Sequence, residues 1–257
     1  MRTIAWRLSA ALAAIAVVAA PGQAGAHSDR EVLWHIVHEQ CIPDQLRNGD
    51  PAPCAEVDLS AGEDRGYAVL KDSGGPDQFL LIPAARVRGI EDPALRAPGA
   101  PNYFEEAWHA RVYTETEAGG TLPRDWISLA VNSADARTQD QLHIHIDCLR
   151  ADVHQALADS AGSIGPAWAP LPVPLAGDSY QAIAIDRLDS VNPFTLATDS
   201  ADAALSTVVV IGAGTTENPG FVVLRRTAAP GSDDPAAGEN LQDHDVCPAP
   251  VGPLPGK

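Results

Sequence analysis

Apolar residues recur at helical spacing in three parts of the chain. The first part predicts a helix over residues 28–40, where a Ser-Asp-Arg-Glu capping box precedes the apolar positions. A second helix is expected over residues 102–119, with Asn102 as its cap and its aromatic side chains in the core. A third helix is expected over residues 152–160, and residues 42–64 are expected to form a loop. Apart from a run at residues 8–20, the other apolar segments are shorter.

These shorter segments predict strands at residues 66–71, 78–83, 126–131, 142–148, 180–186, 207–211 and 221–225. The first two strands and the last two are each expected to form an antiparallel hairpin. Because strands and helices do not alternate regularly, we expect an α+β fold, with an antiparallel sheet and flanking helices in a single domain over residues 27–227. Residues 228–257 are rich in Pro, Gly and Asp, and we expect a C-terminal extension that is disordered except where Cys247 ties it down.

The first 26 residues have the pattern of an export signal. Two arginines precede an apolar run at residues 8–20, and residues 24–26 form a small-x-small cleavage site. The run is shorter than the roughly 18 to 20 residues that cross a bilayer. We therefore expect a cleaved signal and an exported, periplasmic protein; an uncut anchor in the inner membrane is the alternative.

The cysteines agree with export. There are four, an even number, and such a count in an exported protein predicts two disulfides. Three pairings are open. We favour Cys41–Cys54, which closes a short loop, together with Cys148–Cys247, which would pin the C-terminal extension beside the strand at residues 142–148. No pair has the C-x-x-C spacing of a zinc ribbon or a redox motif.

The formal net charge of −17 narrows the range of partners. A chain this acidic is repelled by the nucleic-acid backbone, so a nucleic-acid polymer is not an expected partner. An anionic small molecule would need a local cationic pocket. Lysine is nearly absent after the signal, where only Lys71 and Lys257 occur.

The strand at residues 142–148 carries the candidate chemistry. Side chains alternate between the two faces of a strand, so the apolar residues Leu142, Ile144 and Ile146 would face the core. The other face would carry a row formed by Gln141, His143, His145 and Asp147. Two imidazoles about 7 Å apart in such a row can share one ligand. Imidazole is both a good nucleophile toward phosphorus and a good general acid.

Three other interpretations of this strand remain open. The two histidines could lie on the wet face of a half-exposed strand without any function. His143, His145 and Asp147 could instead hold a metal ion, because His-x-His-x-Asp opens the metal site of the metallo-β-lactamase fold. In that fold a further histidine follows the motif, and here Cys148 stands in its place. A secreted protein that binds a nucleotide without catalysis is the third.

The flanks of the strand resemble the histidine-triad (HIT) superfamily of nucleotidyl hydrolases and transferases. In that superfamily an Asn at the end of one strand is followed by a loop, a Gln and a His-φ-His-φ-His strand. The residues that match in order and spacing are Asn132, Gln139, His143 and His145. Upstream, Asp72 precedes a Phe-Leu-x-Ile-Pro strand at residues 79–83, also as in the superfamily. The resemblance implies a HIT-like fold.

The resemblance also implies a role for each matching residue. His145 would be the nucleophile, and His143 would orient it and the phosphate. Asn132 and Gln139 would line the phosphate loop. Asp72 would bind the ribose hydroxyls, since a carboxylate can accept two O–H bonds.

The departure from the pattern lies at its third position, where Asp147 stands instead of a histidine. Transferase branches of the superfamily also carry another residue there and keep the middle histidine as nucleophile. The departure therefore concerns how the leaving group is protonated. A shifted register, with Gln141 first and His143 as the nucleophile, is the alternative.

Matches along nearly all of the chain after the signal resemble the bacterial CDP-diacylglycerol pyrophosphatase family. They are residues 41–43, 53–57, 67–72, 107–111, 137–145, 241–244 and Cys247. The resemblance implies hydrolysis of CDP-diacylglycerol to CMP and phosphatidate through a CMP–histidine intermediate, with no metal or other cofactor. The lipid substrate would bring the protein to a membrane surface. Lys71, Arg111 or Arg137 would neutralise the anhydride, and His244 would approach the site if Cys148–Cys247 forms.

Overall fold

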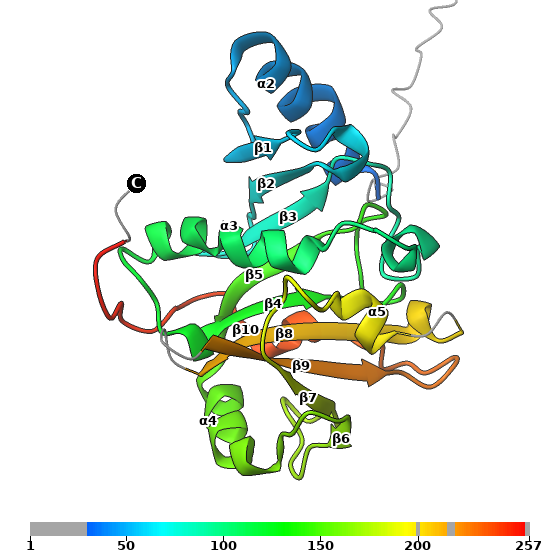
Figure 1. Ribbon diagram of the computed structural model, residues 1–257, viewed down its shortest axis with the longest axis vertical. Coiled ribbons are helices and arrows are strands. Elements are labelled where there is room, and N and C mark those ends of the chain that lie inside the picture. Colours follow the sequence, from blue (N-terminus) through cyan, green and yellow to red (C-terminus); the bar gives the residue numbers. More distant parts are fainter. Residues whose placement is uncertain (1–29, 199–200, 215–218, 255–257) are drawn as a thin grey trace, which may run out of the picture.

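The computed structural model describes residues 30–198, 201–214 and 219–254 (Figure 1). The predicted signal at residues 1–26 and the first half of the predicted capping box, Ser28 and Asp29, lie outside the described residues. Among the helices in the described ranges, none has the length and apolar character needed to cross a membrane.

One antiparallel sheet forms the framework, with the strand order β1-β2-β3-β5-β4-β8-β9-β7-β6. Its strands are β1 (Glu56–Asp58), β2 (Tyr67–Lys71), β3 (Phe79–Pro83), β4 (Ile127–Val131), β5 (Ile144–Leu149), β6 (Ala169–Pro170), β7 (Gln181–Ile185), β8 (Ser206–Gly214) and β9 (Pro219–Thr227). The two predicted hairpins, β2–β3 and β8–β9, are confirmed. The mixture of helices with a single antiparallel sheet confirms the α+β class.

Helices cover both faces of the sheet (Figure 1). They are α1 (Val32–Ile36), α2 (Ile42–Asn48), α3 (Tyr103–Glu117), α4 (Ala151–Ser160) and α5 (Pro193–Ala197). Helix α3 packs on one face, where its aromatic residues join Ile144 and Ile146 of β5 in the main core. On the other face, α1 and α2 cover β2 and β3, while α4 covers the strands beyond β5. The predicted placement of the α3 aromatics in the core is confirmed.

The N-terminal helix differs from its prediction. It does not end near Gln40, because a π-helical turn (Val37–Cys41) joins α1 to α2 and the helical segment ends at Asn48. Pro43 lies in the first turn of α2, directly after the π-helical turn. Ile42 is buried against β2 and β3. The loop expected from residue 42 therefore begins only at Gly49, whose positive φ of 67° ends the helix.

The cap predicted for α3 is also corrected. Asn102 stands at the N-cap position, but its side chain makes no capping hydrogen bond. Its amide instead donates to the carbonyls of Leu188 and Val191. The Asn102 side chain therefore contacts a loop that is distant in sequence instead of capping α3.

The larger correction concerns the C-terminal extension. It was expected to be disordered except where Cys247 ties it down, yet the described residues 228–254 include a 3-10 turn, η7 (Gly238–Leu241), and a strand, β10 (Gln242–Asp243), that pairs with β5. Leu241 is fully buried in the core beside α4. The chain is held because its backbone pairs with β5 and because Cys247 is bonded to Cys148.

Both predicted disulfides, Cys41–Cys54 and Cys148–Cys247, are confirmed. The first links the π-helical turn before α2 to the segment before β1 and spans 13 residues of sequence. The second spans 99 residues and joins β5 to the C-terminal segment.

Candidate active site

Simple alternation along the chain positions His145, which lies in β5, and His143, which directly precedes this strand. Ile144 and Ile146 face the α3 core, so His143 and His145 face the opposite side of the sheet, with Asp147 next in the same row. This side is not wet: the exposed fractions of His143, His145 and Asp147 are 7%, 6% and 1%. The interpretation as a half-exposed strand with functionless histidines on its wet face is therefore wrong about the exposure.

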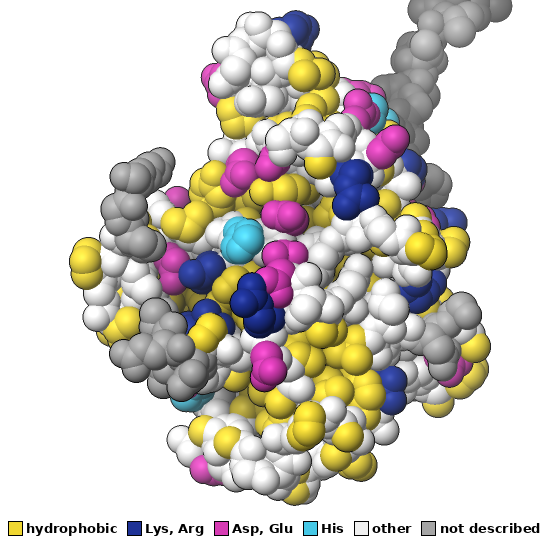
Figure 2. Space-filling model, in the orientation of Figure 1, with side chains coloured by type: hydrophobic (Ala, Val, Ile, Leu, Met, Phe, Trp, Pro, Cys, Tyr) yellow, Lys and Arg dark blue, Asp and Glu magenta, His cyan; other side chains and the backbone are white. Residues whose placement is uncertain are grey.

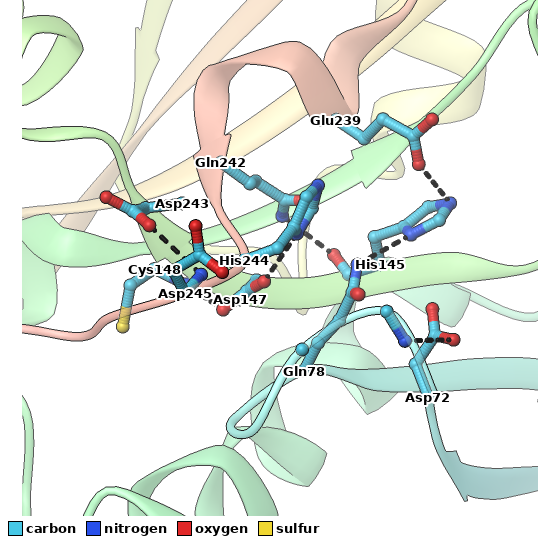
Figure 3. Close-up of polar contacts among 12 residues, drawn as sticks. Asp72, Gln78, His145, Asp147, Cys148, Glu239, Gln242, Asp243, His244 and Asp245 are labelled. Carbon is cyan, nitrogen blue, oxygen red and sulfur yellow. Dashed lines mark hydrogen bonds and ion pairs between the residues drawn. The ribbon is translucent and has the colours of Figure 1, made fainter.

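His145 lies between two segments that are far apart in the sequence (Figure 3). Its Nδ1 is 3.0 Å from the side-chain amide of Gln78, just before β3. Its Nε2 is 3.1 Å from the Glu239 carboxylate in η7, a close contact without hydrogen-bond geometry. Burial lowers the pKa of His145 to about 4, against the opposing charge of Asp72. The imidazole is therefore neutral at neutral pH, as a nucleophile must be.

His143 lies beside His145, with 5.0 Å between the ring centroids. Its Nδ1 is 2.8 Å from the carbonyl oxygen of Gln141. A carbonyl can only accept, so Nδ1 carries the proton and Nε2 keeps a free lone pair. Burial, followed by the charge of His145, lowers the pKa of His143 to about 4. This imidazole too is neutral and has no proton on Nε2 to donate.

Asp147, at the third position of the row, contacts the side chain of another histidine, His244. One carboxylate oxygen of Asp147 accepts from the Cys148 N–H, and the other is 2.9 Å from Nδ1 of His244. Burial raises the pKa of Asp147. The hydrogen bond to Asp147 raises the pKa of His244, which favours the charged imidazole. His244 thus approaches the site, as expected if Cys148–Cys247 forms.

Asp72, Asn132 and Gln139, which were expected to contact the nucleotide, each form a hydrogen bond with a different segment of the protein. Asp72 lies in the β2–β3 turn, close enough for its charge to act on both strand histidines, and accepts from the Gly74 N–H. Asn132 is buried and accepts from the Glu239 N–H, so it holds η7 in place. Gln139 accepts from the Leu33 N–H of α1. Of these side chains, Asn132 fastens a segment that contacts His145, because Glu239 belongs to it.

The three expected cationic residues are engaged elsewhere. The Lys71 ammonium donates to three carbonyls of the β2–β3 turn. Arg137 is buried between Glu91 and Asp140. Arg111 belongs to α3, on the opposite face of the sheet, where it stacks over Trp108. In these contacts none of the three is directed at His145.

A large cavity lies away from His143 and His145. It has a volume of about 1070 Å³ and opens between α3, α4 and the ends of β7 to β9, with Trp108, Arg124 and Phe221 in its lining. Figure 2 shows the molecule from the side of α3, with apolar surface next to clustered acidic and basic side chains. A smaller hollow of about 490 Å³ is lined by residues 150–152 and 242–245 and reaches His244.

The comparisons with known proteins point to one family. The family model of CDP-diacylglycerol pyrophosphatases matches residues 28–249. A CDP-diacylglycerol pyrophosphatase from Yersinia pestis is 40% identical over 249 residues, which are 95% of each chain. This chain belongs to the CDP-diacylglycerol pyrophosphatase family.

The comparison with solved structures is less informative about the fold. A DUF4931 family protein from Bacillus cereus aligns with a TM-score of 0.42 and 12% identity, over 67% of this chain and 88% of that one. Similarity at this level does not decide the fold, so the HIT-like topology stays a prediction for this CDP-diacylglycerol pyrophosphatase family member.

The side chains of the alternative metal site, His143, His145 and Asp147, do not come together as a ligand set in this family member. In the described part of the chain, one acidic and thiol cluster has donor atoms within 4.8 Å of one another, and it consists of Asp147, Cys148 and Cys247. Both of its sulfurs are in the disulfide, so neither is a thiolate. His143 and His145 do not join Asp147 in such a cluster.

Three residues of the site were not found from the sequence. Gln78 stands directly before the Phe-Leu-x-Ile-Pro strand, and its contact with His145 needs the pairing of β3 with β5. Glu239 and Gln242 belong to the segment that was expected to be disordered. The Gln242 amide donates to the backbone carbonyls of Ser128 and His145 and so locks that segment to the sheet. The match of residues 241–244 to the CDP-diacylglycerol pyrophosphatase family was the one available signal.

Proposed function

We propose that the protein hydrolyses the pyrophosphate bond of CDP-diacylglycerol to CMP and phosphatidate, with Nε2 of His145 as the nucleophile. The observation that carries this proposal is the neutral, buried His145 between Gln78 and Glu239, in a chain that belongs to this family. Attack at the cytidine-side phosphorus would release phosphatidate and leave CMP bonded to the imidazole. Water would then release CMP, so that one difficult displacement becomes two easier ones.

The tautomer of His145 depends on Gln78. An attacking Nε2 needs its lone pair, so the proton must sit on Nδ1 and be accepted by the Gln78 carboxamide. The oxygen and nitrogen of a carboxamide exchange places by a half-turn, and the carbonyl oxygen of Gln78 would then face Nδ1. In this arrangement Gln78 accepts the Nδ1 proton and orients the nucleophilic ring directly.

The Glu239 carboxylate stands where an incoming phosphoryl group would have to come, 3.1 Å from Nε2. Substrate binding therefore requires this side chain to turn away, and its exposed fraction of 31% leaves it room to do so. Asp72 is proposed to accept the ribose hydroxyls from the other side of the histidines. The substrate would bring the protein to a membrane surface, and the two disulfides support an exported, periplasmic protein.

A second candidate nucleophile is His143, in the shifted register. The observation that favours it is the hydrogen bond from Nδ1 to the Gln141 carbonyl, which leaves the Nε2 lone pair of His143 free. Its role would otherwise be to orient His145 and the phosphate.

The test is the release of CMP from CDP-diacylglycerol in detergent micelles with a chelator present. The wild type, His145→Asn and His143→Asn are compared, and acid-labile CMP–enzyme is trapped by rapid denaturation. We expect turnover to fall by roughly 1000-fold or more in His145→Asn, with no trapped CMP, because the covalent step is lost. An active His145→Asn with an inactive His143→Asn would move the nucleophile to His143. Loss of wild-type activity with the chelator would favour a metal-dependent hydrolase, and nucleotide binding without CMP release would indicate a non-catalytic protein.

A further inference from the structure

The proposed reaction needs a proton for the oxygen that leaves with phosphatidate. Neither strand histidine can supply it. His145 presents a lone pair at its attacking nitrogen, and His143 is neutral with its proton committed to the Gln141 carbonyl. Asp147, the residue in the third position of the row, is turned away into its hydrogen bonds with Cys148 and His244.

His244 is brought to the site by contacts that do not involve its own side chain. The β10 strand directly before it pairs with Leu149 and Cys148 of β5, and Cys247 is bonded to Cys148 three residues later. The β2–β3 turn closes on it from another side. A Cβ added to Gly75 would lie 2.2 Å from the His244 carbonyl oxygen, so the turn and the C-terminal segment are in close contact. The backbone of His244 is therefore held from two directions.

The side chain of His244 is oriented by Asp147 (Figure 3). Nδ1 donates to the buried carboxylate at 2.9 Å, which turns Nε2 away from Asp147. The His244 side chain keeps an exposed fraction of 35% and lines the hollow of residues 150–152 and 242–245, so it can exchange a proton with solvent. It is also close enough to His145 for its charge to lower the pKa of that residue.

The charges around His244 favour its protonated form. The groups whose charges act on it or on its partner are Asp147 and His145 of β5, Glu239 of η7, and Asp72 and Asp77 of the β2–β3 turn. On the side of the hollow, the charged residues are Arg150, Asp152, Asp243 and Asp245. Asp147, Glu239 and Asp72 all raise the pKa of His244, the hydrogen bond to Asp147 most of all. Of the three imidazoles described above, this one has a proton to give.

We infer that His244, oriented by Asp147, is the general acid and then the general base of the reaction; this rests on the proposed function of His145. In the first step Nε2 of His145 bonds to the cytidine-side phosphorus and the bond from that phosphorus to the bridging oxygen breaks. The proton on Nε2 of His244 passes to that oxygen, which leaves with phosphatidate.

In the second step water attacks the same phosphorus and gives a proton to Nε2 of His244. The phosphorus–nitrogen bond breaks, its electron pair returns to His145, and CMP leaves. Each imidazole ends as it began, and the sum is the addition of one water to the anhydride. Asp147 acts as a positioning residue that keeps the proton of Nδ1 in place and Nε2 toward the reaction.

The experiment uses two leaving groups with the full-length protein. CDP-diacylglycerol releases a phosphate oxygen that the acid assists, whereas the 2,4-dinitrophenyl ester of CMP releases a phenolate that is a much weaker base and needs no proton. For His244→Gln we expect first-turnover CMP–enzyme formation from CDP-diacylglycerol to fall about 100-fold, the usual contribution of a general acid. The first-turnover burst of 2,4-dinitrophenolate should stay within about threefold of the wild type, since that leaving group bypasses the acid.

The matched control is His154→Gln, which replaces a histidine paired with Asp125 near the large cavity and should leave both bursts unchanged. Equal losses on the two substrates in His244→Gln would overturn the inference, because they would indicate a structural role. An unchanged rate on CDP-diacylglycerol would overturn it as well. His145→Asn should lose both bursts; if it keeps them, the proposed nucleophile fails, and that result is distinct from any outcome at His244.

Discussion

Strand β5 and the C-terminal segment both contribute to the site, but they are positioned by different physics. In β5 the alternation of side chains sets the row of His143, His145 and Asp147, so a few adjacent residues define their faces. The C-terminal segment brings Glu239 and His244 from about 100 residues away in sequence, as shown by the 99-residue span of the disulfide that holds it. Local patterning makes one half of the site, and long-range contacts make the other.

Removing a disulfide is the strongest test of the difference between β5 and the C-terminal segment. Removing Cys148–Cys247 by a double Ser substitution should lower the free energy of unfolding by about 4.7 kcal/mol for a loop near 100 residues, and also lower kcat roughly 100-fold as His244 loses its place. The measurements are urea unfolding followed by tryptophan fluorescence and CMP release at a temperature where the variant is folded.

The matched control removes Cys41–Cys54, which spans 13 residues and packs with α1 and α2 rather than holding the C-terminal segment. It should cost about 3 kcal/mol of stability while the folded variant keeps its kcat. If both double variants lose activity in proportion to stability alone, the C-terminal segment has no separate part in the site.

The contact between β3 and β5 provides the next test. Gln78→Leu should lower kcat roughly 10- to 100-fold because the Nδ1 proton of His145 loses its acceptor, an effect typical of groups that orient an imidazole. Gln78→Glu, which can still accept that proton, should retain more activity. The tautomer is followed by the ¹⁵N shifts of the His145 ring. A Gln78→Leu variant with unchanged shifts and kcat would show that β5 alone orients the nucleophile.

The two halves should also differ in pH dependence. Burial lowers the pKa of His145 to about 4, so kcat/KM should fall about tenfold per pH unit below that value as the nucleophile is protonated. His244 has a raised pKa, so the basic limb should lie above the ordinary histidine value of 6.5, and His244→Gln should remove that limb alone. A basic limb that survives in His244→Gln would assign it to another group.

The free energy of unfolding should depend on pH in the direction set by the lowered pKa values of His143 and His145. Unfolded histidines bind protons near pH 6.5, whereas His143 and His145 in the folded protein do so only near pH 4. Between these values the unfolded state binds more protons, so the free energy of unfolding should fall as the pH drops from 6.5 to 4. Urea titrations at several pH values should show this slope, and replacing both histidines with Gln should reduce it.

Glu239 gives the smallest expected effect. Its carboxylate lies beside Nε2 of His145 and would repel the anionic anhydride, so Glu239→Gln should lower KM by roughly threefold at low salt and less at high salt. Initial rates at two ionic strengths measure this. A rise in KM would mean that Glu239 assists substrate binding, contrary to the charge argument.

The accuracy of the sequence-based predictions follows the same division. The β2–β3 and β8–β9 hairpins and α3 are set by short-range patterns, and they agree with the structure. Residues 228–254 were expected to be disordered because Pro, Gly and Asp are poor formers of regular structure. Composition does not reveal the pairing of β10 with β5 or the burial of Leu241, and these contacts order the segment.

Taken alone, the sequence determined the α+β class, the expectation of two disulfides, the family and the row that contains His143 and His145. Each of these depends on spacing along the chain or on matches in order. Only the tertiary structure decided that the row is buried, that Gln78 and Glu239 flank His145, and that His244 stands behind Asp147. The reason is that such contacts depend on which strands pair and which segments close over them, and neighbouring residues carry no record of that choice.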